Sequence, residues 1–161
     1  MSEPFVVNVA DAPALHHERG GWTTVLEPPE ARFEQFGINI RVLVPGQPNG
    51  LYHREAMQEA FLVLGGECIL ILDGEERPLK QWDFVHCPPG TGHIFVGAGD
   101  GPCTILMVGA RGDDGNGLHY PVDDVAAGHG ASVAEETSDP PTAYADWGRD
   151  FTPGRLPWPP A

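Results

Sequence analysis

Tyr-His-Arg-Glu-Ala-Met-Gln-Glu, residues 52–59, is followed about thirty positions later by Pro-Pro-Gly-Thr-Gly-His, residues 88–93. The first segment places His53 close in sequence to two carboxylates, and the second contributes His93 just after a rigid Pro-x-Gly turn. Apolar runs with strand character separate the two segments. We therefore expect a β fold that brings their polar side chains together.

The surrounding chain has the pattern of an all-β domain. Apolar residues recur at every second position from Phe36 to Val44, the period of a half-buried strand, and turn residues follow at 45–50. Further strands are predicted at residues 60–64, 67–72, 82–87, 93–96 and 103–108. This makes about seven or eight strands joined by short turns, without a helical period, and indicates an antiparallel double-sheet or barrel fold. The jelly roll is the natural member of that class.

Two extensions flank the predicted barrel, which we place at residues 32–111. The N-terminal extension, 1–31, has candidate strands at 5–9 and 21–26 that could add to the barrel, with two histidines, His16 and His17, predicted in an exposed loop between them. The C-terminal extension, 112–161, is acidic and Pro-rich, and short helices are predicted within it at 121–127 and 139–147. Its aromatic residues should pack on the barrel or on a partner subunit: Tyr144, Trp147, Phe151 and Trp158.

Charge and cysteine content exclude several classes of function. The 161-residue chain carries 9 basic and 23 acidic residues, a formal net charge of −14, so it has no basic stripe for nucleic acid or for an anionic membrane surface. No apolar run approaches the ~20 residues of a membrane span, and the acidic N-terminus is unlike a secretory signal, so we expect a cytoplasmic protein. Three cysteines lie within apolar segments and are predicted to be buried, reduced thiols: Cys68, Cys87 and Cys103.

The two polar segments have the composition of a metal site. In an extended chain, side chains two apart share a face, which would align His53, Glu55, Met57 and Glu59. With His93 from a second strand, the face offers two imidazoles and one or two carboxylates, a donor set that suits a divalent ion such as Zn, Fe, Mn, Ni or Co. Taken alone, each segment has a plainer interpretation: His53 and Glu55 could be a solvated surface pair, and His93 could simply follow a turn. Only one of His86 and Cys87, neighbours on one strand, can point inward.

These segments resemble the two motifs of the cupin family. His53 and Glu59, followed by Phe-x-Val-Leu-x-Gly at 61–66, are similar to the first motif, and Pro-x-Gly-x-x-His at 88–93 is similar to the second. The resemblance implies a jelly-roll barrel in which His53, Glu59 and His93 bind the metal. Glu55 stands where the motif has a second histidine, and Gly97 stands where the second motif usually ends in Asn. By this likeness Glu55 is a fourth metal ligand, a catalytic base, or a residue that points away.

Two functions follow from this resemblance. The first is a mononuclear metal enzyme of the oxygenase, isomerase or decarboxylase type, which acts on a small organic molecule in the barrel with Glu55 as a catalytic group. The alternative is a non-catalytic cupin that binds a small molecule or a sugar, with a structural metal or none. Cupins are commonly dimeric, and the apolar tail supports the same expectation of a homodimer.

Overall fold

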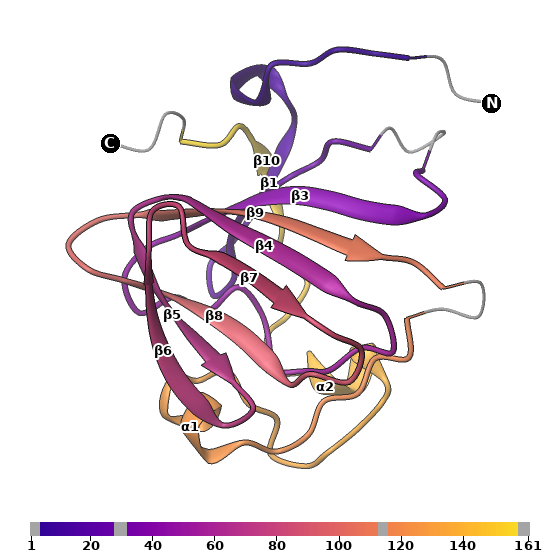
Figure 1. Ribbon diagram of the computed structural model, residues 1–161, viewed down its shortest axis with the longest axis vertical. Helices are drawn as coiled ribbons and strands as arrows, with labels where there is room; N and C mark the ends of the chain where they lie inside the picture. The colour runs from indigo at the N-terminus through magenta and orange to yellow at the C-terminus, as the bar shows by residue number, and fades with distance from the viewer. Residues whose placement is uncertain (1–3, 28–31, 113–115, 158–161) are drawn as a thin grey trace.

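The computed structural model describes residues 4–27, 32–112 and 116–157, which form two antiparallel sheets with a few short helices (Figure 1). The larger sheet has seven strands in the order β10-β1-β2-β3-β9-β4-β7, and the smaller has three in the order β6-β5-β8. The larger sheet consists of β1 (Ala14–His17), β2 (Gly21–Thr24), β3 (Phe36–Leu43), β4 (Glu59–Gly65), β7 (Phe84–Cys87), β9 (Cys103–Ala110) and β10 (Thr152–Gly154). The smaller consists of β5 (Glu67–Leu72), β6 (Glu75–Lys80) and β8 (His93–Ala98). The predicted all-β jelly-roll fold is confirmed.

The main core lies between the two sheets. Inward side chains from β4 and β9 meet those of β5 and β8 in a single cluster that excludes water, as facing sheets of a sandwich do. Its largest members include Phe61, Val63, Leu70, Phe95 and Ile105. All three cysteines are buried and reduced, as predicted.

Strand β3 is covered on both faces, which the alternating pattern alone did not show. Its apolar face, with Ile40 and Val42, packs outside the barrel against Ala14 of β1 and against Leu156, which follows β10. Figure 1 shows β1 and β10 crossing this side of β3. The other face of β3 therefore points into the barrel, and it carries polar residues.

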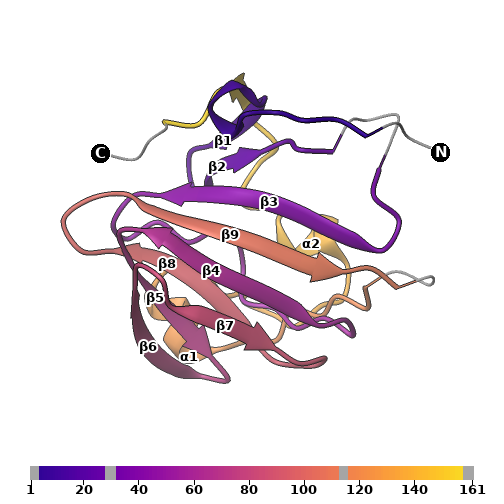
Figure 2. The same ribbon diagram turned by 45° about the horizontal axis from the view of Figure 1, so that its top comes forward.

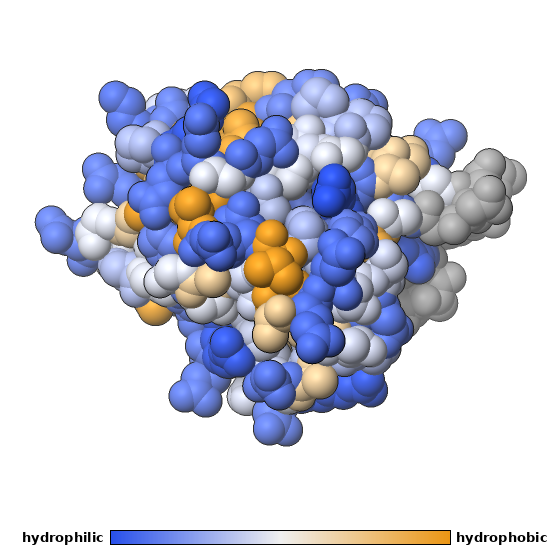
Figure 3. Space-filling view, turned by 90° about the horizontal axis from the view of Figure 1, so that it is seen from below, coloured by the Kyte–Doolittle hydropathy of each residue, from blue (hydrophilic) through white to orange (hydrophobic). Residues whose placement is uncertain are grey.

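The C-terminal extension covers the smaller sheet. Helix α1 (Asp124–Gly128) contributes Ala126 to a second cluster with Ile71, Ile94 and Val96, and Figure 2 shows it beside β5 and β8. The outer face of the molecule on this side is mostly hydrophilic, with its hydrophobic residues scattered (Figure 3). Tyr144 packs on the barrel as predicted, since its hydroxyl accepts a hydrogen bond from the Leu51 amide at 2.9 Å.

Several predicted elements differ from the structure. Residues 5–8 form no strand, and a 3-10 turn, η1 (Val9–Asp11), follows; β propensity makes no strand where no sheet edge accepts it. His16 and His17 belong to β1 rather than to an exposed loop, and His17 is buried because its ring stacks on Trp147, with centroids 5.7 Å apart.

The helices were placed correctly but are shorter than predicted. Asp139 caps α2 (Pro140–Ala143), and its side chain accepts a hydrogen bond from the Thr142 amide, as its position before two prolines suggests. Helix α1 starts three residues after Pro121. No helix among the described residues is long and apolar enough to cross a membrane. Trp158 lies outside the described residues, and the boundaries of the barrel and its extensions stay predictions.

Candidate metal centre

A backbone bridge brings the two histidines together. His53 and His93 form an isolated antiparallel pair in which each amide donates to the other's carbonyl, at 3.3 and 2.9 Å. Residues directly opposite in such a pair project their side chains to the same side. The two imidazole centroids consequently lie 4.9 Å apart, although the residues are forty positions apart in the sequence.

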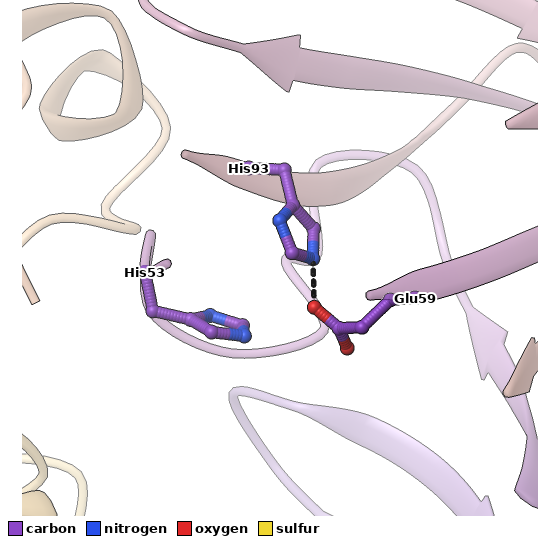
Figure 4. Close-up of side chains that lie close together, drawn as sticks. All are labelled: His53, Glu59 and His93. Carbon is purple, nitrogen blue, oxygen red and sulfur yellow. Dashed lines mark ion pairs between the residues drawn. The ribbon is translucent and has the colours of Figure 1, made fainter. Parts of the chain in front are cut away.

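Glu59 completes the group from the start of β4. It pairs with Gly109 of β9 and shares its strand face with Phe61, which points into the barrel. Its Oε2 lies 3.1 Å from Nε2 of His93 (Figure 4). One ligand atom from each of His53, Glu59 and His93 lies within 4.8 Å of the others, so that one ion could contact all three after small side-chain rotations.

In both imidazoles, a hydrogen bond from the ring nitrogen that faces away from the site holds the ring in the orientation that metal binding needs. Nδ1 of His53 lies 2.8 Å from the Leu51 carbonyl, and Nδ1 of His93 lies 3.1 Å from the Thr91 carbonyl. Because a carbonyl only accepts, Nδ1 carries the proton in each ring, and the lone pair of neutral imidazole is on Nε2, toward the site.

The electrostatics of the two histidines differ. Burial, with a contribution from His93, lowers the pKa of His53 to about 4, so His53 is neutral near pH 7. Burial, the largest single effect, would lower the pKa of His93, but the hydrogen bond and charge of Glu59, together with the Thr91 carbonyl and the charge of Glu55, outweigh burial and raise it. His93 and Glu59 thus share a proton that a metal ion would replace.

Glu55 lies beside these three residues without joining them. Its Oε1 is 3.9 Å from Nε2 of His53, and its Oε2 accepts a hydrogen bond from the Asn116 amide at 2.8 Å. Burial and the nearby Glu59 raise the pKa of Glu55 to about 7. A carboxyl group with such a pKa can accept or donate a proton near neutral pH. Whether Glu55 acts as a base or as a fourth ligand stays a prediction.

The three residues open into a cavity of about 280 Å³, just below the usual range for small-molecule sites. Phe61 and Met107 line the cavity and also belong to the main core, whereas Phe84 is exposed on β7. Cys87 is the buried member of its pair, and His86 points outward.

Sequence reasoning missed the polar groups of this cavity. Beyond the residues already described, its walls include Asn39, Arg41, Asn49, Arg111 and Asn116. Asn39 and Arg41 alternate with the apolar residues of β3, and a strand with one apolar face is normally expected to turn its polar face to solvent. The inward direction of Asn39 and Arg41 could have been inferred from the outer strands. When added strands cover the apolar face of a strand, its polar face can turn inward.

Comparison with known proteins identifies the family. Residues 39–109 match the family model described as the cupin domain, and no curated protein sequence matches the chain. A sugar phosphate isomerase from a cupin superfamily, from Silicibacter pomeroyi, is 25% identical with a TM-score of 0.52, over 88% of this chain and 80% of that one. The polyketide cyclase RemF from Streptomyces resistomycificus is 19% identical with a TM-score of 0.58, over 67% and 80%, which shows the fold alone.

A third structure, provisionally named a sugar phosphate isomerase, comes from Acidithiobacillus ferrooxidans. It is 26% identical with a TM-score of 0.51, over 58% of this chain and 62% of that one, so the present chain spans less than two thirds of that protein's length. The two-sheet barrel, the family match and these relatives together show that residues 39–109 are a cupin domain of the small conserved-barrel type.

Proposed function

We propose that the protein is a mononuclear metal enzyme that transforms a small organic molecule bound in its barrel. The observation that carries the proposal is the convergence of His53, Glu59 and His93 on one point, beside an open cavity. Backbone carbonyls hold Nδ1 of both rings, so Nε2 of each faces the site, and an ion would displace the proton that His93 shares with Glu59. A divalent ion held there supplies Lewis acidity toward an oxygen of the substrate.

Glu55 favours a reaction that includes proton transfer. Its carboxyl group lines the same cavity, its pKa is raised to about 7, and Asn116 fixes its orientation. A general base works best when its pKa lies near the working pH. Isomerisation and decarboxylation both need such a group, and two of the structural relatives are named as sugar phosphate isomerases. We therefore favour these two classes over oxygenation.

Metal analysis tests the proposal directly. The untagged protein should contain close to one transition-metal ion per chain, and loading with excess metal at about a hundred times Kd should stabilise it by about 2.7 kcal/mol. His53→Ala and His93→Ala should each lose the ion, because each removes one of the three donors. His86→Ala is the matched control, since His86 is an exposed histidine on β7 outside the cavity, and it should keep the ion.

Glu55→Gln separates the two roles of that residue. Full metal content in this variant would assign Glu55 to proton transfer, and a loss of metal would make it a ligand. Wild-type protein that binds no ion after loading, with a melting temperature unchanged by chelator, would refute the enzyme and leave the non-catalytic binding module. The metal analysis also identifies the ion. The cytoplasmic location and the homodimer stay predictions.

A further inference from the structure

The cavity contains a guanidinium group, that of Arg41, for which the described residues provide no carboxylate partner. Arg41 lies on the inward face of β3, two residues after Asn39, and both line the cavity that opens onto His53 and Glu59. Across the sheet, Asn39 pairs with Met107 and Arg41 with Ile105, so Arg41 lies one row deeper in the barrel than Asn39.

Within the described residues, the hydrogen bonds of Arg41 are largely unmade. Nη1 donates to the Gly20 carbonyl at 3.4 Å, Nε is buried without a partner, and no carboxylate lies within ion-pair distance. The amide oxygen of Asn39 is likewise buried without a partner. Burial of an unpaired cation carries a free-energy penalty, so native proteins rarely keep one without a use.

Arg111 provides the contrast within the same cavity. Its guanidinium group makes two bonds to the Glu27 carboxylate, from Nη1 at 2.8 Å and from Nη2 at 2.9 Å. The fold can thus supply a bidentate carboxylate to an arginine at this site, and it does so for Arg111. Arg41 has no such partner among the described residues, and its charge also contributes to the lowered pKa of His53, which places it near the metal centre.

We propose that Arg41 is the anchor for a carboxylate group of the substrate, which makes the substrate a small monocarboxylic acid. The planar guanidinium group matches a carboxylate in bidentate geometry, and Nδ2 of Asn39, two residues away on the same strand face, is a second donor in the cavity wall. One carboxylate matches the one inner guanidinium group that Arg41 offers, since Arg111, which lines the same cavity, is already paired with Glu27. The proposal names the substrate class of the site above and in that sense rests on the proposed function.

Binding measurements on the full-length protein, loaded with zinc, test the assignment. The probes are pyruvate and lactate, their neutral amides pyruvamide and lactamide, and inorganic phosphate, each followed by calorimetry and by thermal melting. Wild-type protein should bind the two carboxylates and raise its melting temperature with them, and it should not respond to the amides. Arg41→Gln should weaken carboxylate binding at least tenfold, the factor expected when a charged hydrogen-bonding partner is lost.

Two further measurements keep the result unambiguous. Arg77→Gln, an exposed arginine on β6, should bind the probes like wild type. Without ligand, Arg41→Gln should melt no lower than wild type, because it removes a cation that the fold leaves unpaired. An equal response of wild type and Arg41→Gln to the carboxylates, including no response in either, would overturn the proposal. So would phosphate binding that depends on Arg41 while carboxylate binding does not, or a lower melting temperature of the ligand-free variant.

The result is independent of the metal test. Zinc content should be the same in wild type and Arg41→Gln. Carboxylate binding that depends on Arg41 in protein that holds no zinc would refute the metal enzyme and keep the anion site. Bound zinc with carboxylate binding that is indifferent to Arg41 would refute the anion site and keep the metal centre.

Discussion

At the scale of single residues, Glu27 and Arg111 show how a charge pair joins the N-terminal segment to the barrel. Arg111, just after β9, donates two hydrogen bonds to the Glu27 carboxylate, and the Phe33 amide donates a third at 3.0 Å. Burial alone would raise the pKa of Glu27, but the hydrogen bonds from Arg111 and from backbone groups outweigh it and leave the pKa below its ordinary value of 4.5. The ionised form of Glu27 is therefore the one that the fold stabilises.

Glu27→Gln should destabilise the protein in a pH-dependent way. Because the folded-state pKa of Glu27 is lowered, its stabilising effect is complete above the unfolded value of 4.5 and is lost as the pH falls through the lower folded value. We expect the free energy of unfolding of wild type to exceed that of the variant by about 1 kcal/mol at pH 7, with a smaller difference at pH 3, below the unfolded pKa of 4.5. Urea unfolding of the metal-free proteins at both pH values measures it.

The matched control for this pair is Glu75→Gln. Glu75 pairs with Arg77 on the solvent side of β6, where both side chains are more than half exposed, so its loss should change the free energy of unfolding little at either pH. A Glu27→Gln effect of equal size at both pH values would show that the carboxylate charge does not matter.

Residue patterns predicted the metal group better than they predicted the rest of the cavity. His53, Glu59 and His93 stand at fixed spacings within segments that resemble known motifs, so one sequence was enough to select them. Arg41 stands in a plain alternating strand, and its inward direction depends on strands β1 and β10, which lie far away in the sequence. Asn116, which orients Glu55, likewise comes from the C-terminal extension. Such contacts between distant segments leave no local signal.

At the scale of elements, Gly97 explains one departure from the cupin motif. Strand β8 passes close to the turn after β3, where the Gly46 amide donates to the Gly97 carbonyl at 2.7 Å and the Gly97 amide donates to the Gln47 carbonyl at 2.9 Å. A Cβ atom at position 97 would overlap the Val44 carbonyl oxygen. The close approach of two backbones therefore requires glycine where the motif usually has Asn.

Gly97→Asn should consequently destabilise the protein rather than restore a motif. The clash is with backbone atoms, which cannot move aside without breaking the two hydrogen bonds, so we expect a loss of about 2 to 3 kcal/mol. Gly101→Asn is the matched control: a Cβ at that position would have no neighbour within 4 Å, and the change should stay within about 0.5 kcal/mol. Thermal or urea unfolding compares the two variants, and equal stabilities would contradict the steric account.

Elements with strong local patterns were predicted well, and an element that depends on its neighbours was not. Strands β3, β4, β5, β8 and β9 coincide closely with apolar runs. The sequence of strand β6 contains charged residues and Pro78, which disfavour strand formation. The strand forms because it pairs along its whole length with β5.

At the scale of the whole molecule, the two ends of the chain close over the same face of the barrel. Strand β10 pairs with β1, so that residues 14–16 meet residues 152–154. Leu156 then inserts beside Ala14, Ile40 and Val42 and is 6% exposed. This contact ties the end of the described chain to the outer face of β3, the strand whose inner face carries Arg41.

Leu156→Ala should therefore lower global stability by about 2 to 3 kcal/mol, the cost of truncating a buried leucine. Val122→Ala, at a site that is 52% exposed, serves as the control and should change the free energy of unfolding by less than about 0.5 kcal/mol. Urea unfolding measures both. Since Leu156 packs on the face of β3 opposite to the cavity, the Leu156→Ala protein should keep the wild-type metal content while it is folded. A stability equal to wild type would mean that the C-terminal segment separates from the barrel without cost, and a loss of metal in the folded variant would mean that the two faces of β3 are coupled.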